Sequence, residues 1–173
     1  MAKIAIPRPE YPRPQFERSE WLNLNGVWDF EIDNGVSGKE RKMFADYTFN
    51  SKINVPFCPE SELSGVNNKD FMNAVWYKKV VELPWKASDG RTILNIGACD
   101  YTTTVWVNGT QVGFPHIGGY VAFSYDITEE YWEDFAEIVG IEYVKINKDT
   151  TISSFKQELR MNEIYYMLNK SLC

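Results

Sequence analysis

Few residues in this chain of 173 could do acid–base, metal or nucleophilic chemistry. His116 is the only histidine, so the chain cannot build a pair of histidine ligands or a triad that draws on a second histidine. The three cysteines, Cys58, Cys99 and Cys173, lack CxxC spacing, which favours free thiols over a zinc or redox motif. We therefore expect no bound metal and no cofactor.

Two acidic pairs, Glu129-Glu130 and Glu133-Asp134, invite comparison with the carboxyl pair of a glycosidase. A retaining glycosidase holds an acid and a nucleophile about 5 Å apart. Both pairs here fall in the first turns of a predicted helix with Thr128 as its N-cap, where carboxylates favour the helix dipole. We interpret them as solvated helix-start residues and expect no catalytic residue in this chain.

Aromatic residues are abundant, with six tryptophans and ten tyrosines. Pyranose rings stack on aromatic faces while fixed polar groups bind their hydroxyls, so such residues are candidates for a carbohydrate site. Trp28 and Trp106 lie in predicted strands and are interpreted as core residues. Trp76 and Tyr77 are neighbours in another predicted strand, so they face opposite ways and only one can enter a given core. Trp76 is kept as a candidate for stacking.

The elements that must position these groups are short strands separated by turn residues. The segments with strand character are 24–32, 53–56, 75–83, 93–96 and 102–107. Asn108-Gly109 follows the last of them and predicts a hairpin, because both residues tolerate the positive φ of a type I′ turn. Residues 36–52 are polar, with a cluster of basic side chains, and predict a solvated loop. The pattern is typical of a mainly β fold, an antiparallel β-sandwich.

The composition is that of a folded acidic protein, with 44% hydrophobic residues and a formal net charge of −6. This charge argues against nucleic acid or an anionic membrane as a partner. No apolar run approaches the ~20 residues that span a bilayer, and the first residues lack the apolar core of a signal peptide. We expect a soluble protein of the cytoplasm.

Four segments resemble the N-terminal sugar-binding domain of family-2 glycoside hydrolases, the β-galactosidases and β-glucuronidases. They are LNGVWDFEID (24–33), INVPFCPESELSG (53–65), FMNAVWYKKVVELP (71–84), and VWVNGTQVG with HIGGYVAFSYDIT (105–128). The resemblance covers about residues 5–128 and implies a jelly-roll sandwich similar to galactose-binding domains. In that family both catalytic carboxylates come from a (β/α)₈ barrel further along the chain. The resemblance thus implies a non-catalytic domain that supports the barrel and shapes one wall of a sugar pocket.

The same resemblance suggests where sugar would be contacted. In some family members the loop before the strand of Trp76 carries an asparagine to the substrate, and Asn73 is the nearest match. Asp100 and Tyr101, at a strand turn, are a second pair of candidates, one polar and one aromatic, for contact with a sugar. With half of the pocket missing, we expect any affinity for a galactoside or glucuronide to be weak.

His116 and Tyr120 belong to HIGGY, a motif that these sugar-binding domains share. They are included as candidate sugar-binding residues. The alternative interpretation is structural, with Gly118-Gly119 forming a tight bulge and the two side chains hydrogen-bonding loops in place.

The sequence pattern changes after Asp126. In TEEYWEDFAEIVG (128–140) the apolar residues recur at helical spacing, residues 141–146 have strand character, and residues 151–168 predict a second helix. The chain is therefore divided into a sandwich domain, residues 1–128, and a helix–strand–helix appendage, residues 129–173.

This tail is similar to the extreme C-terminus of bacterial L-arabinose isomerases, through EDFAEIVGIEYVKINKDTTISSFKQELRMNEIYY (133–166). The histidine segment that helps to bind metal in that family has no counterpart here, because Gly119-Tyr120-Val121 stand in its place. Both resemblances meet near Phe123-Ser124, which indicates a chimera. The final jelly-roll strand is replaced, and we expect residues 141–146 to fill its position, in the same chain or by exchange with another. The amphipathic tail also predicts a homodimer.

Three functions follow from these patterns. The first is a non-catalytic carbohydrate-binding or scaffold domain, and the second is a structural or interaction domain without a ligand. The third is residual glycosidase or isomerase activity, against which the missing carboxylates and metal ligands argue.

Overall fold

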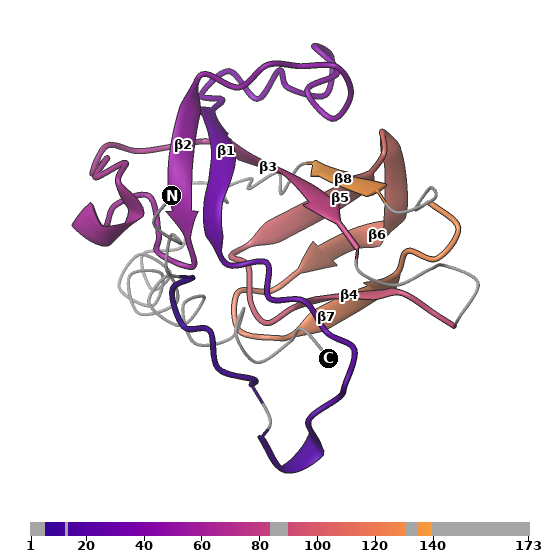
Figure 1. Cartoon of the computed structure of the whole chain (residues 1–173). Helices are drawn as coiled ribbons and strands as arrows, with labels where there is room; N and C mark the ends of the chain where they lie inside the picture. The colour runs from indigo at the N-terminus through magenta and orange to yellow at the C-terminus, as the bar shows by residue number, and fades with distance from the viewer. Residues whose placement is uncertain (1–5, 13, 84–89, 131–134, 140–173) are drawn as a thin grey trace.

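The computed structural model describes residues 6–12, 14–83, 90–130 and 135–139, and nearly all of its regular structure is β (Figure 1). The predicted mainly β fold is confirmed. In chain order the elements are the 3-10 helix η1 (Pro14–Phe16), β1 (Gly26–Ile32), β2 (Ser51–Val55), the 3-10 helix η2 (Glu62–Ser64), β3 (Val75–Glu82), β4 (Ile93–Ile96), β5 (Thr102–Val107), β6 (Thr110–Ile117), β7 (Phe123–Asp126) and β8 (Phe135–Val139).

The strands form two antiparallel sheets. The larger sheet has the order β2-β1-β3-β8-β5-β6, and the smaller one pairs β4 with β7 (Figure 1). One apolar core joins them, because Phe30 and Val105 of the larger sheet belong to the same buried cluster as Leu94 and Ile96 of the smaller one. This arrangement agrees with the predicted sandwich.

The hairpin between β5 and β6 turns where the sequence predicted. Asn108 and Gly109 both have positive φ, at 48° and 79°, as a type I′ turn requires. The Asn108 side-chain amide also donates to the Glu130 carbonyl oxygen at 2.8 Å. The turn is thereby tied to the chain at Glu130.

A second buried cluster lies on the other face of the larger sheet, away from the main core. Met43 and Phe49 of the loop between β1 and β2 pack there with Trp76 of β3 and Trp106 of β5. Phe44 stacks on Trp106, with ring centroids 5.3 Å apart. The prediction of a solvated loop over residues 36–52 holds for most of its polar residues but not for Met43 and Phe49, which are buried and cover the two tryptophans.

The predicted helix beginning at Thr128 is also wrong where the structure describes it. Phe135–Val139 is a strand, β8, paired with both β3 and β5. Thr128 begins no helix, since its hydroxyl accepts the Thr92 backbone N–H at 2.9 Å and donates to Asp126. Backbone pairing on both sides has overridden the helical spacing of the segment.

The rest of the predicted tail lies outside the described residues. This holds for the strand at 141–146 and the helix at 151–168. Between β3 and β5 the larger sheet contains β8, and the expectation that residues 141–146 fill the position of the final jelly-roll strand stays a prediction. The division into domains after residue 128 stays a prediction.

Candidate functional site

The topology places most of the candidate sugar-binding residues toward one end of the larger sheet. Because β3 and β5 are each antiparallel to β8, they run parallel to each other, and Lys78 and Trp106 share Val139 as a pairing partner. The starts of β3 and β5 therefore lie toward the same end. Asn73 precedes β3 by two residues, and Asp100 stands two residues before β5.

The candidate residues around the start of β5 and the end of β6 lie in one region that hydrogen bonds and a ring contact hold together. The Gly118 N–H donates to the Tyr101 carbonyl oxygen at 2.8 Å. The His116 ring stacks on Phe123 with centroids 4.0 Å apart and an interplanar angle of 15°. Its Nε2 lies 3.2 Å from the Gly118 carbonyl oxygen and donates to it in the tautomer protonated there. These contacts hold the HIGGY bend in place.

The exposure of the candidates in this region differs sharply. Asp100 is buried, with 2% of its surface exposed, and Tyr101 and His116 are half-buried. Tyr120 is 36% exposed, which makes its ring the most accessible of the candidate aromatic rings. Of these four residues, Tyr120 therefore offers the best stacking face to a sugar.

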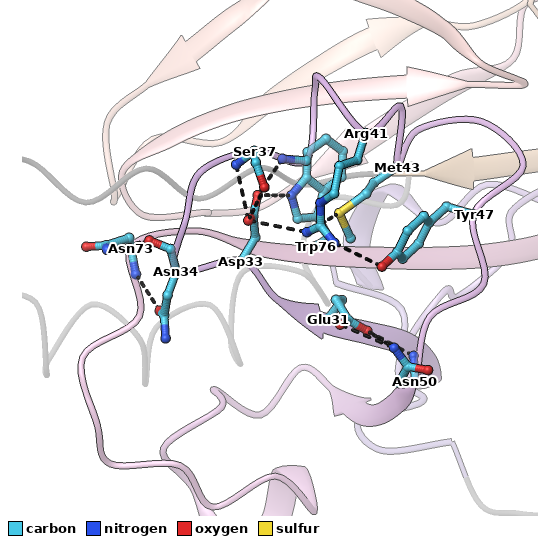
Figure 2. Close-up of polar contacts among 11 residues, drawn as sticks. Glu31, Asp33, Asn34, Ser37, Arg41, Met43, Tyr47, Asn50, Asn73 and Trp76 are labelled. Atoms are coloured by element: carbon cyan, nitrogen blue, oxygen red, sulfur yellow. Dashed lines mark hydrogen bonds and ion pairs between the residues drawn. The ribbon is translucent and has the colours of Figure 1, made fainter.

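Asn73 and Trp76 are both engaged with the rest of the protein. The Asn73 amide donates to the Asn34 carbonyl oxygen at 2.7 Å, which joins the start of β3 to the turn after β1 (Figure 2). Trp76 has no exposed surface and stacks on Trp106 at 5.2 Å. Trp76 thus presents no open face on which a sugar ring could stack, because it packs under the loop after β1.

Asp33, which directly follows β1, organises this region (Figure 2). Its carboxylate accepts the Gly38 N–H at 2.6 Å, the Trp76 indole N–H at 3.3 Å, and both the N–H and the hydroxyl of Ser37. The Arg41 guanidinium pairs with it at 3.4 Å. One buried carboxylate thereby fixes the loop to the sheet.

The environment of Asp33 also sets its charge. Burial raises the pKa of this carboxyl, but the N–H donors of Ser37, Gly38 and Trp76 together with the charge of Arg41 outweigh the burial and hold the pKa below its usual value. Asp33 is therefore ionised at neutral pH. With so many donors attached, it serves as an anchor rather than as a general acid.

The sequence analysis did not identify the role of Asp33 and Arg41 in fixing this loop to the sheet. The available signal was the turn sequence Asp33-Asn34-Gly35 directly after an alternating strand. That pattern marks a turn, but it does not reveal the partner Trp76, which lies 43 residues away.

Within the part of the chain that the structure describes, no group of three His, Cys, Asp or Glu side chains is placed to hold a metal ion. No helix among the described residues has the length and apolar character to cross a membrane.

Comparison with known proteins finds two different likenesses. No model of a protein family matches the chain. It is 34% identical to the β-glucuronidase of Felis catus over 131 residues, which covers 69% of this chain and 20% of that protein. It is 80% identical to the L-arabinose isomerase of Bacteroides thetaiotaomicron over 51 residues, which covers 30% of this chain and 10% of that protein. The chain spans about a fifth of the length of the one relative and a tenth of the other.

Solved structures agree with the first likeness. A β-glucuronidase from an uncultured Clostridium species superposes with a TM-score of 0.66 at 24% identity, covering 77% of this chain and 24% of that one. A β-glucuronidase from Ruminococcus gnavus in complex with D-glucaro-d-lactam gives a TM-score of 0.67 at 18% identity. At these identities the likeness shows the fold. Together, the comparisons support a domain like part of a β-glucuronidase, and the isomerase match supports a chimeric chain.

Proposed function

We propose that this chain is a non-catalytic carbohydrate-binding or scaffold domain derived from a β-glucuronidase-like glycoside hydrolase. The observation that carries the proposal is the match to β-glucuronidases over 69% of the chain and only 20% of the relative, together with the shared sandwich fold. Hydrolysis needs two carboxyl groups on either side of the glycosidic bond. Asp33, the buried carboxylate that anchors the loop, is occupied by its donors.

The finer form of the proposal is a jelly roll with one sugar-facing end. It is supported by the sheet topology, in which Asn73, Asp100, Tyr101, His116 and Tyr120 lie toward one end of the larger sheet. Tyr120 supplies the stacking face, and a galactoside or a glucuronide is the ligand class. The affinity is weak, since binding energy comes from few groups on a surface that is open on one side.

One set of observations favours a second candidate, a structural or interaction domain without a ligand. Trp76 is fully buried, the Asn73 amide is bound to Asn34, and His116 is stacked on Phe123. These groups stabilise the fold whether or not a sugar is present. A homodimer through residues 129–173 also remains a prediction, because most of that tail lies outside the described residues.

Turnover assays separate both candidates from an enzyme. The purified chain is incubated with a chromogenic β-glucuronide, a chromogenic β-galactoside, and arabinose with manganese. We expect no turnover above a blank without protein. Saturable turnover of any of the three substrates by the wild-type chain would overturn the non-catalytic assignment.

A further inference from the structure

The dipeptide Asn-Gly occurs three times in this chain, at Asn25-Gly26, Asn34-Gly35 and Asn108-Gly109. In such a dipeptide the backbone nitrogen of the glycine can attack the side-chain amide of the asparagine, because glycine carries no side chain to obstruct the approach. The reaction needs an accessible asparagine side chain, an accessible glycine N–H and an amide nitrogen that is free to leave. Since the three sites share the dipeptide, the fold decides which of them reacts.

The fold holds Asn25 and Asn108 by their side-chain amides. Asn25 is 4% exposed, and its Nδ2 donates to the Pro7 carbonyl oxygen at 3.1 Å. The Nδ2 of Asn108 donates to the Glu130 carbonyl oxygen at 2.8 Å, in a residue whose backbone is fixed by the hairpin turn. At both positions the nitrogen that would leave is bound, so these sites react only after a local opening of the structure.

Asn34 differs from both of these residues. It is exposed in the turn after β1, and both of its hydrogen bonds to Asn73 are accepted by oxygen (Figure 2). Its Oδ1 accepts the Asn73 backbone N–H at 3.3 Å, and its carbonyl oxygen accepts the Asn73 side-chain amide at 2.7 Å. Among the described residues nothing accepts from Asn34 Nδ2 or from the Gly35 N–H. The leaving nitrogen and the attacking nitrogen are therefore both unbound within the described structure.

The Asn73 backbone N–H also favours the reaction itself. It donates to Asn34 Oδ1, which is the oxygen that gains negative charge when the amide carbon is attacked. A donor already in place at such an oxygen stabilises the developing charge.

We propose that the fold selects Asn34, among the three Asn-Gly sites, for spontaneous deamidation. The Gly35 nitrogen forms a bond to Asn34 Cγ, the Cγ–Nδ2 bond breaks, and Nδ2 leaves as ammonia with the proton of the Gly35 N–H. Solvent water then opens the cyclic imide. Opening at Cγ gives aspartate, and opening at the main-chain carbonyl carbon gives isoaspartate, whose backbone runs through the side-chain carbons. The proposal does not depend on sugar binding.

The two products have different effects on the segment before β3. Aspartate keeps the main-chain carbonyl oxygen in place and retains a side-chain oxygen for the Asn73 N–H. Isoaspartate adds one carbon to the main chain, which moves the carbonyl oxygen that the Asn73 amide binds at 2.7 Å. Isoaspartate therefore detaches Asn73 from the turn after β1, whereas aspartate does not.

Ageing of the full chain tests the site. The folded chain is incubated in warm, mildly alkaline buffer, and peptide mass spectrometry with electron-transfer fragmentation follows aspartate and isoaspartate at each asparagine. We expect conversion at Asn34 to be at least about tenfold faster than at Asn25 and Asn108, which react only after local opening. In urea, where the fold is lost, the three rates should converge. Gly35→Ala should slow conversion at Asn34 several-fold, because its methyl group obstructs the attack, and should leave Asn108 unchanged.

Two outcomes would overturn the proposal. One is equal conversion of the three asparagines in the folded chain, and the other is an advantage of Asn34 that persists in urea, where the fold cannot cause it. A ¹⁵N NMR spectrum tests the consequence for Asn73. We expect its side-chain amide resonance to shift in the isoaspartate fraction of the aged chain and to stay in place in Asn34→Asp. An unchanged resonance in the isoaspartate fraction would contradict the detachment.

Discussion

At the scale of single residues, Asp33 does more for this structure than any of the candidate sugar-binding groups. Its buried carboxylate binds the backbone of Ser37 and Gly38, the indole of Trp76 and the guanidinium of Arg41. These partners come from the loop after β1 and from β3. The fold in this region therefore depends on one ionised group.

Replacing Asp33 should lower stability in a pH-dependent way. We expect Asp33→Asn to reduce the free energy of unfolding by about 1–3 kcal/mol at pH 7, because the amide cannot accept all the donors that the carboxylate binds. The folded-state pKa lies below the unfolded value of about 3.9, so the stabilisation is complete above that value and is lost as pH falls through the folded pKa. Urea unfolding at several pH values measures it.

The matched control for Asp33 is Asp29, which pairs with Lys52 at the surface, where the Lys52 side chain is 69% exposed. Asp29→Asn should change the free energy of unfolding by less than about 1 kcal/mol. Equal effects of the two substitutions, or an Asp33→Asn difference that persists unchanged at acid pH, would contradict the assignment of Asp33 as an ionised anchor.

Gly38 tests how tightly the same loop approaches the sheet. A Cβ at Gly38 would lie 2.3 Å from the Trp76 indole nitrogen, and that ring is fully buried against Trp106. We expect Gly38→Ala to cost about 1–3 kcal/mol, since neither side can move freely. At Gly35, in the same loop, the nearest atom would be 3.6 Å away. Gly35→Ala should fall within about 0.5 kcal/mol of wild type by thermal or urea unfolding.

At the scale of elements, the loop between β1 and β2 acts as a cover for the outer face of the sheet. Met43 is fully buried although it belongs to a loop rich in charged residues. We expect Met43→Ala to cost about 2–5 kcal/mol, as for other buried side chains truncated to alanine. Leu63, which is 65% exposed in η2, is the control, and its replacement by alanine should be nearly neutral. A neutral Met43→Ala would mean that the loop is solvated, as the sequence predicted.

Local sequence patterns predicted most strands, but they failed where pairing with strands distant in the sequence determines the structure. The strands β3, β4 and β5 and the Asn108-Gly109 turn follow from alternation and turn chemistry. Phe135–Val139 has helical spacing, yet β3 and β5 supply backbone partners on both sides, and long-range pairing prevails over local propensity. No local pattern reveals those partners.

The candidate site also depends on contacts between residues that are distant in the sequence. The sequence predicts a stacking role for Trp76, because two aromatic neighbours in a strand cannot share one core. In the structure Trp76 instead lies in a second buried cluster, on the outer face of the sheet. Tyr77 packs against the main core. The sequence could not predict the second cluster, because it requires the loop carrying Met43 to fold back over Trp76.

At the scale of the whole molecule, the chain shows two likenesses. The chain is similar to a β-glucuronidase over 131 residues and to an L-arabinose isomerase over 51 residues. The strand that joins the two parts of the larger sheet is β8, Phe135–Val139. We propose a non-catalytic sandwich with a weakly sugar-binding end.

The measurement that tests this account most directly is a two-dimensional ¹⁵N NMR titration of the full chain with glucuronic acid and with galactose. We predict weak, saturable shifts that cluster at Asn73, Tyr101, His116 and Tyr120, and that diminish in Tyr120→Ala. Phe16→Ala, which removes an aromatic ring that is 73% exposed in η1, should leave them unchanged. A well-dispersed spectrum without saturable shifts at this end of the sheet would contradict sugar binding and leave a scaffold without a ligand.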